Sequence, residues 1–140
     1  MQGYRTGRHC VFALHVHLVF VTKYRRDVLS QLAIRDLSEI FARVCSDFGA
    51  ELVECNGKDD HVHLLVEYPP QVPISKLVNS LKGVSSRRLR SLRPEISGRY
   101  FKGVLWSPSY FAASCGGAPI TIVRQYVEQQ RGLFMGRAPP

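Results

Sequence analysis

The sequence predicts an α+β domain, in which a split β-α-β arrangement forms an antiparallel sheet with helices on one face. Two observations support this class. Apolar residues alternate with polar ones in some segments, as in strands, and recur every three or four residues in others, as in helices. These segments follow in the order β-α-β-β-α-β, with an extra helix after them. That order is typical of ferredoxin-like and RRM-like domains, whose first and third strands are central.

The first half of the chain is expected to supply a strand, a helix and a hairpin. Residues 10–23 are rich in valine, phenylalanine, leucine and histidine, which favours a largely buried strand. A helix follows and ends near Gly49, a residue typical of helix C-termini. Its apolar positions are Leu37, Ile40, Phe41, Val44, Cys45 and Phe48. We expect a short strand over residues 50–54, a turn at the Asn-Gly pair 56–57, and a returning strand over residues 61–68.

The second half begins with three prolines between residues 69 and 73, which break the chain before a second helix. The apolar stripe of that helix consists of Ile74, Leu77, Val78 and Leu81. Residues 100–114 again have an extended pattern. Gly116 and Gly117 then precede a third helix over about residues 118–131, with a proline in its first turn.

The composition fits one folded domain. The chain has 140 residues and 45% hydrophobic content, which suggests a single domain over residues 1–140, a core of about residues 8–115 and a loose tail over 132–140. No apolar run suits a membrane span. The four cysteines are too widely spaced for a zinc finger: Cys10, Cys45, Cys55 and Cys115. We therefore expect a reduced, cytoplasmic setting and no membrane partner.

The charge is strongly positive and unevenly distributed. The formal net charge is +8, and residues 71–102 hold eight lysines and arginines against Glu95 alone. Such a segment favours an anionic partner such as nucleic acid. Four of its basic residues lie on the second helix and are expected to contact phosphates: Lys82, Arg87, Arg88 and Arg90. Near the first strand, Lys23, Arg25 and Arg26 are expected to add to this surface.

Two histidines of the third strand form the most specific candidate site. In a strand, His61 and His63 project from one face while Val62, Leu64 and Val66 project from the other. Two neutral imidazoles side by side can hold a divalent metal. The first strand repeats the pattern at His15 and His17, and spacing alone does not separate the two copies. If the strands are neighbours, a cluster of four histidines is conceivable.

Tyrosine and glutamine share one face of the expected third helix. Tyr126 and Gln130 are four residues apart, about one helical turn, so a nucleophile and a polar ligand could arrive together. The simpler interpretation of each is a half-buried tyrosine and a solvated glutamine.

The chain resembles a known family, the single-tyrosine HUH transposases of small bacterial insertion sequences, of the TnpA type. The resemblance covers nearly the whole chain and is carried by five segments: HLVFVTKYRRDVL, CNGKDDHVHLLVEYPP, ISKLVNSLKGVSSRRLR, LWSPSYFAASCGG and VRQYVEQQ. It implies that His61 and His63 bind a divalent ion, that Tyr126 is the nucleophile and that Gln130 completes the metal site. Family members often have asparagine at the position of Gln129, which leaves Gln129 as an alternative ligand. No metal role comes with the resemblance for His15 or His17.

The resemblance also implies an activity, cofactors and partners. Proteins of this type cleave and rejoin single-stranded DNA through a 5′-phosphotyrosine, with Mg²⁺ or Mn²⁺ as the cofactor. They bind DNA hairpins near the element ends and act as homodimers, with the active site shared between subunits in some arrangements. Gly116 and Gly117 are expected hinges for the tyrosine helix. The protein would then be associated with the nucleoid when it is bound to DNA.

Three acidic residues lie close to the histidines in sequence. Asp59 or Asp60 could orient an imidazole through the ring nitrogen that does not bind the metal, although capping of the turn is the simpler interpretation. Glu67 shares the strand face of His61 and His63 and is expected to be solvated.

Two other function classes remain open from the sequence. A non-enzymatic RRM-like module would have the same strand order and basic character, but it needs exposed aromatic rings on the first and third strands. Replication initiators and relaxases share the HUH chemistry, but their chains are usually longer.

Overall fold

The computed structural model describes residues 5–6, 11–12, 14–97 and 104–114. Its strands are β1 (Arg5–Thr6), β2 (Val11–Phe12), β3 (His15–Val21), β4 (Glu51–Lys58), β5 (His61–Glu67) and β6 (Phe111–Ser114). Its helices are α1 (Gln31–Asp47), α2 (Ile74–Leu92) and the short α3 (Pro94–Ser97), and a 3-10 turn, η1, spans Lys23–Arg25.

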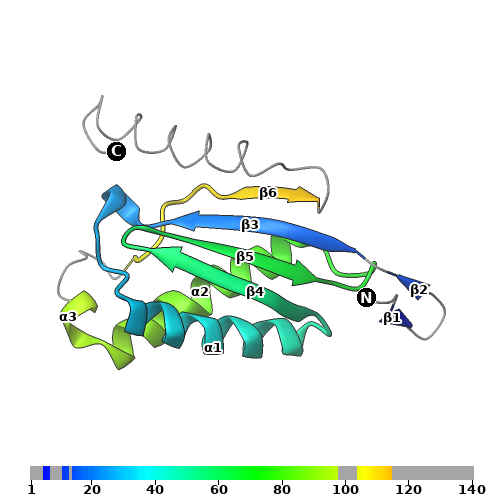
Figure 1. The fold of residues 1–140 in the computed structure, drawn as a ribbon, viewed down its shortest axis with the longest axis horizontal. Helices are drawn as coiled ribbons and strands as arrows, with labels where there is room; N and C mark the ends of the chain where they lie inside the picture. The colour runs from blue at the N-terminus through cyan, green and yellow to red at the C-terminus, as the bar shows by residue number, and fades with distance from the viewer. Residues whose placement is uncertain (1–4, 7–10, 13, 98–103, 115–140) are drawn as a thin grey trace.

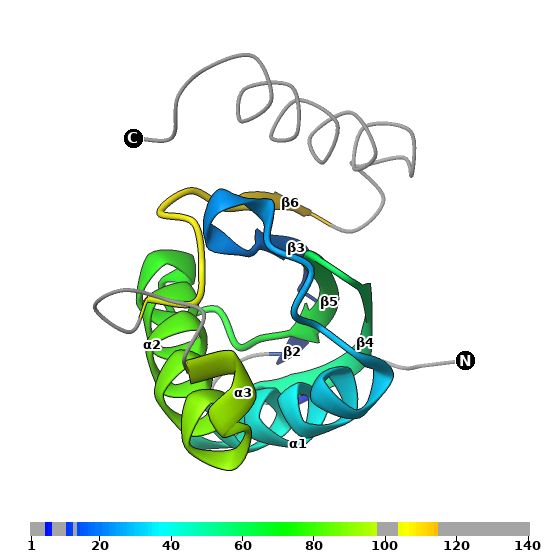
Figure 2. The same ribbon diagram turned by 90° about the vertical axis from the view of Figure 1, so that its left-hand side faces the viewer.

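A four-stranded antiparallel sheet forms the centre of the fold. Its strand order is β4-β5-β3-β6, so the first and third long strands, β3 and β5, are central, as the ferredoxin-like plan predicts. Figures 1 and 2 show α1 and α2 on the same face of this sheet. The predicted fold class is confirmed. The opposite face of β3 and β5 is therefore the one on which the candidate site is built.

The core lies between the sheet and the two long helices. On β5, Val62, Leu64 and Val66 are fully buried, whereas His61 and His63 are only half-buried on the other face. The strand alternation predicted from the sequence is confirmed. The helices add the apolar positions expected from their spacing, and Phe20 packs edge-on against the rings of Phe41 and Trp106.

The hairpin between β4 and β5 differs from the prediction. Asn56 and Gly57 are not a turn, because β4 continues to Lys58 and the chain reverses at Asp59 and Asp60. Asp59 takes a positive φ of 55°, a conformation that aspartate tolerates better than most residues. Gly57 instead allows the main chain of β4 to lie close to the His61 carbonyl and to the Ile34 side chain. A Cβ there would lie 2.7 Å from the His61 carbonyl oxygen and 2.7 Å from Cδ1 of Ile34.

The ends of α1 follow the sequence signals. Ser30 caps the N-terminus by accepting a hydrogen bond from the Ala33 N–H at 3.1 Å. At the other end, Gly49 adopts a φ of 72° and its N–H donates to the Ser46 carbonyl. Both features fix where the chain leaves the helix and enters β4.

Other segments differ in extent. The strand expected over residues 10–23 is the shorter β3, preceded by the small β1–β2 ribbon, and the extended segment over 100–114 contains only β6 as a strand. Neither the ribbon nor α3 was predicted. Among the described residues, no helix is both long and apolar enough to cross a membrane. The expected third helix with its Gly116–Gly117 hinge lies outside the described residues.

Candidate functional site

Four histidines lie on the sheet face that α1 and α2 leave uncovered. His15 and His17 come from β3, and His61 and His63 come from the neighbouring strand β5. The register pairs Val19 with His63, so His17 and His63 lie diagonally across the two strands. All four side chains are half-buried. The two histidine pairs that spacing alone could not separate therefore share one surface.

His61 is the end of a chain of three polar groups. Its Nδ1 donates to Oδ1 of Asp60 at 3.1 Å, and Oδ2 of the same carboxylate accepts from Nε of Arg25 at 2.7 Å. The side chains of Arg25 and Asp60 are only 6% and 7% exposed. A carboxylate on one imidazole nitrogen fixes the ring orientation and leaves Nε2 as the nitrogen available to a ligand.

The charge state of Asp60 is set by these partners. Burial alone would raise its pKa, but the hydrogen bonds from His61 and Arg25 and the positive charge of Arg25 outweigh burial and hold the pKa below the ordinary value. Asp60 is therefore a carboxylate at neutral pH and accepts hydrogen bonds on both oxygens. Its Oδ1 contacts Nδ1 of His61, so Asp60 is placed to orient the His61 ring.

The side chain of the adjacent Asp59 is exposed, unlike that of Asp60. The main chain of Asp59 bridges to Leu29, with the Leu29 N–H donating to the Asp59 carbonyl at 2.8 Å. The Thr22 N–H donates in the same way to the Asp60 carbonyl at 2.9 Å. The segment after β3 is thus tied by its main chain to the β4–β5 turn, which brings Arg25 to Asp60.

His63 contacts the first strand. Its Nε2 lies 3.0 Å from Nδ1 of His17, and the two ring planes differ by 17°. Burial is the main cause that lowers the pKa of His63, and the nearby His17 lowers it further. His63 is therefore neutral at pH 7, which is the form that binds metals.

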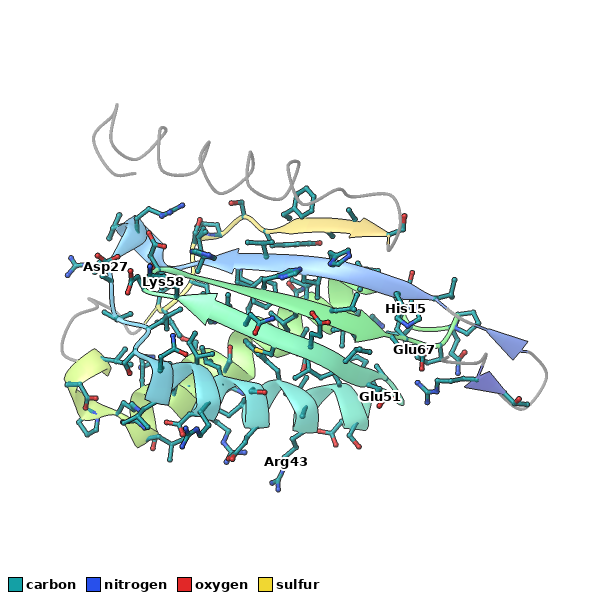
Figure 3. All side chains as sticks on the ribbon, in the orientation of Figure 1. His15, Asp27, Arg43, Glu51, Lys58 and Glu67 are labelled. Carbon is teal, nitrogen blue, oxygen red and sulfur yellow. The ribbon has the colours of Figure 1, made fainter. Side chains whose placement is uncertain are left out.

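The far end of the same face holds an ionic cluster. Glu67 lies 3.4 Å from Nε2 of His15 and 3.3 Å from Nε of Arg5, and its side chain is 8% exposed. Figure 3 shows His15 and Glu67 beside each other on β3 and β5. The expectation of a solvated Glu67 was wrong, because its strand partner His15 and the arginine of β1 enclose the carboxylate.

The donor chemistry of His61 and His63 suits a divalent metal, but the set is incomplete within the described residues. No group of three histidine, cysteine, aspartate or glutamate side chains is arranged there to hold a metal ion. The expected remaining ligand, Gln130, its alternative Gln129 and the nucleophile Tyr126 all lie outside that part of the chain. The structure thus provides two imidazoles, one of them fixed by a carboxylate.

The basic residues predicted to contact DNA separate into two groups. Arg87, Arg88 and Arg26 are exposed, and Lys23 and Arg90 are partly exposed. Lys82 instead donates to the carbonyl oxygens of Ser107, Pro108 and Ser109 at 2.6, 3.2 and 3.3 Å. Because a lysine has three donors, its ammonium is fully engaged in holding this loop. The side chain of Arg25 is buried against Asp60, so both Lys82 and Arg25 have partners within the fold.

The described cysteines do not add a reactive group. Cys45 and Cys55 are free thiols in this part of the chain. Burial raises the pKa of Cys45 to about 12 and that of Cys55 to about 11, so both are protonated at neutral pH.

The two central strands also lack the exposed rings that an RRM-like module needs. Within the central strands β3 and β5, the only aromatic ring other than the histidines is Phe20, which is fully buried on the helix side. Base stacking on these two strands, the basis of RRM binding, has no platform there.

Sequence reasoning missed the roles of His17, Arg25 and Lys82. The resemblance carries no metal role for His17, and a contact between His17 and His63 becomes visible only in the register between β3 and β5. The two basic residues were grouped with their exposed neighbours because burial is not visible in a charge pattern.

Comparisons with known proteins all match this chain to transposases. The family model described as "Transposase IS200 like" matches residues 10–130. The ISDra2 transposase TnpA of Deinococcus radiodurans is 32% identical over 126 residues, which is 90% of each chain. The transposase for insertion sequence element IS200 of Salmonella typhimurium is 28% identical over 114 residues, 81% of this chain and 74% of the relative. The crystal structure of a transposase candidate from Deinococcus radiodurans superposes with a TM-score of 0.82 at 36% identity, covering 90% of this chain and 97% of the other.

Proposed function

The chain belongs to the family of IS200-like transposases, and from this membership we propose that it cleaves and rejoins single-stranded DNA at the ends of an insertion sequence. The observation that carries the proposal is the pair His61 and His63 on the sheet face opposite α1 and α2, with Asp60 hydrogen-bonded to both His61 and Arg25. A replication initiator or relaxase would use similar histidines, but the family match favours transposition.

The residues proposed to hold the metal are His61, His63 and Gln130. A bound Mg²⁺ or Mn²⁺ would supply positive charge against the negative charge that develops at the scissile phosphate. Asp60 would keep the His61 ring in one orientation, and the depressed pKa of His63 keeps its imidazole neutral and able to bind. Because imidazole suits Mn²⁺ better than Mg²⁺, we expect activity with both and tighter binding of Mn²⁺.

The proposed nucleophile is Tyr126. Its phenolate oxygen would form a bond to the phosphorus, and the bond from phosphorus to the 3′ oxygen would break, with a proton passing to that oxygen through water. The products are a 5′-phosphotyrosine and a free 3′-OH. Since the covalent link keeps the phosphodiester bond energy, a 3′-OH can reverse the attack and reseal a strand without ATP. Cleavage and joining are then the same reaction run in two directions.

The proposed DNA surface consists of exposed and partly exposed cations on two elements. Lys23 and Arg26 lie at the turn after β3, and α2 adds Arg87, Arg88 and Arg90. Contacts of these groups to phosphates would position a DNA hairpin without reading its sequence. We also propose a homodimer, with Gly116 and Gly117 as hinges of the tyrosine helix.

A cleavage assay tests the proposal. The protein is incubated with Mn²⁺ and single-stranded DNA that carries the element ends, and the products are separated on a denaturing gel. We expect cleavage by the wild type, loss of cleavage in His61→Ala and His63→Ala, and little change in the matched strand variant His15→Ala. Equal cleavage of duplex DNA, or full activity of both histidine variants, would contradict the proposal.

A further inference from the structure

The two imidazoles of His17 and His63 meet through their nitrogens. The ring centres are 5.2 Å apart, whereas Nδ1 of His17 and Nε2 of His63 are only 3.0 Å apart, and the planes differ by 17°. The two nitrogens therefore lie between the ring centres, and the rings meet at their edges in nearly one plane. This is the geometry of a hydrogen bond in which one ring donates N–H to the lone pair of the other.

Only one direction of this hydrogen bond is compatible with a metal on His63. If His17 donates, Nε2 of His63 uses its lone pair for that bond, and Nδ1 of the neutral ring carries the proton. His63 then has no lone pair for a metal. If His63 donates from Nε2, its Nδ1 has a free lone pair, and His17 is the acceptor.

We propose that His17 is a positioning residue for His63: its Nδ1 accepts a hydrogen bond from Nε2–H of His63, so that Nδ1 of His63 is available to the metal. The inference rests on the proposed function, because it assumes that His63 is a ligand. It gives each histidine of the pair a partner on its second nitrogen. Asp60 accepts a hydrogen bond from Nδ1–H of His61, and His17 accepts one from Nε2–H of His63. Such partners fix the tautomer and orientation of a ligand before the metal arrives.

The neighbouring His15 provides a matched control. It lies two residues from His17 on the same strand and the same face, but it pairs with Glu67 rather than with His63. Loss of its imidazole would remove a histidine from this surface without touching the bond to His63.

The experiment combines nitrogen NMR of the histidine rings with Mn²⁺ binding measured by electron paramagnetic resonance. The variants are His17→Leu, His17→Asn and His15→Asn. Asparagine can place a side-chain oxygen near the position of the His17 Nδ1 and so can still accept the proton. In the wild type we expect the Nε2–H tautomer of His63. We expect His17→Leu to lose this preference and to bind Mn²⁺ about tenfold more weakly, since loss of such a partner costs ~10- to 100-fold in metal affinity. His17→Asn should restore both properties, and His15→Asn should match the wild type.

Several outcomes would overturn the inference. They are an unchanged His63 tautomer and Mn²⁺ affinity in His17→Leu, or a wild-type His63 whose proton is on Nδ1. If the folded wild type binds no Mn²⁺ at all, the proposed metal site is wrong as well, which separates that failure from one confined to His17. Thermal unfolding of each variant establishes that it is folded, and the position of the His63 proton in the wild type provides the test if His17→Leu is not.

Discussion

Arg25 and Asp60 form a buried ion pair, with Nε of the arginine 2.7 Å from Oδ2 of the aspartate and both side chains less than a tenth exposed. The pair joins the turn after β3 to the turn before β5, and Asp60 continues the contact to His61. Each of the two residues has a neighbour of the same type, Arg26 and Asp59, which is exposed. The structure thereby distinguishes members of two adjacent pairs that look equivalent in sequence.

Replacement of Asp60 should damage both the fold and the metal site. In Asp60→Asn the charge that compensates Arg25 is lost, and removal of one partner from a buried ion pair costs about 3 kcal/mol of the free energy of unfolding. Loss of the carboxylate behind His61 should also weaken Mn²⁺ binding by roughly 10- to 100-fold. Denaturant unfolding and Mn²⁺ titration measure the two effects.

The control for this change is Asp59→Asn. Asparagine accepts the positive φ of Asp59 readily, and the side chain is exposed, so stability and Mn²⁺ affinity should stay close to the wild type. Equal effects of the two substitutions would contradict the assigned role of Asp60.

The depressed pKa of His63 predicts a dependence of stability on pH. The folded pKa lies below the ordinary 6.5 because of burial and the nearby His17. As the pH falls from 7.5 through 6.5 towards the folded pKa, the unfolded chain takes up a proton that the folded chain does not, so the free energy of unfolding should decrease. The decrease over this window, measured by urea unfolding, should be smaller in His63→Gln. If the free energy of unfolding changed equally with pH in the wild type and in His63→Gln, His63 would not be the cause of the pH dependence.

Lys82 should act on stability rather than on DNA binding. In Lys82→Met, three carbonyls of residues 107–109 lose a charged donor, and we expect a loss of about 1–3 kcal/mol. The matched variants Arg87→Gln and Arg88→Gln lie on the exposed side of the same helix and should change stability by less than about 0.5 kcal/mol.

Salt-dependent DNA binding provides the second readout for the same three variants. Removal of the Arg87 or Arg88 charge should weaken single-stranded DNA binding and reduce the slope of log affinity against log salt by about 0.7 for each phosphate that the variant no longer neutralises. Lys82→Met should keep the wild-type slope while it is folded. If only Lys82→Met reduced this slope, Lys82 and not the two arginines would contact the DNA phosphates.

Gly57 should be intolerant of a side chain. In Gly57→Ala the new Cβ would lie 2.7 Å from the His61 carbonyl oxygen and from Cδ1 of Ile34, and relief of such overpacking costs about 1–3 kcal/mol. Gly83→Ala is the control, since a Cβ there meets only the end of the flexible Arg87 side chain at 3.7 Å and should stabilise α2 by about 0.5–1 kcal/mol. Thermal unfolding of both variants compares them directly, and a Gly57→Ala protein as stable as the wild type would refute the packing argument.

The sequence was sufficient for the order of the main elements and for the faces of β5. Alternation in a strand depends only on local geometry, so His61 and His63 were correctly placed opposite Val62 and Leu64. The turn was misplaced because Gly57 is required by a contact with α1, and an Asn-Gly pair has the same appearance whether it makes a turn or a close approach. His17 and Arg25 could not be assigned for a related reason. His17 contacts a residue of β5, and Arg25 contacts a residue of the β4–β5 turn. The spacing of residues along one strand does not determine how that strand is aligned with its neighbour.

The proposed reaction requires a covalent bond between Tyr126 and the 5′ phosphate of cleaved single-stranded DNA. The most direct measurement is mass spectrometry of the peptide that contains Tyr126, after incubation of the protein with Mn²⁺ and single-stranded DNA carrying the element ends. We expect a nucleotide adduct on Tyr126 in the wild type and in His15→Ala, and no adduct in Tyr126→Phe. An adduct that persists in Tyr126→Phe, or one found on another residue of the wild type, would contradict it.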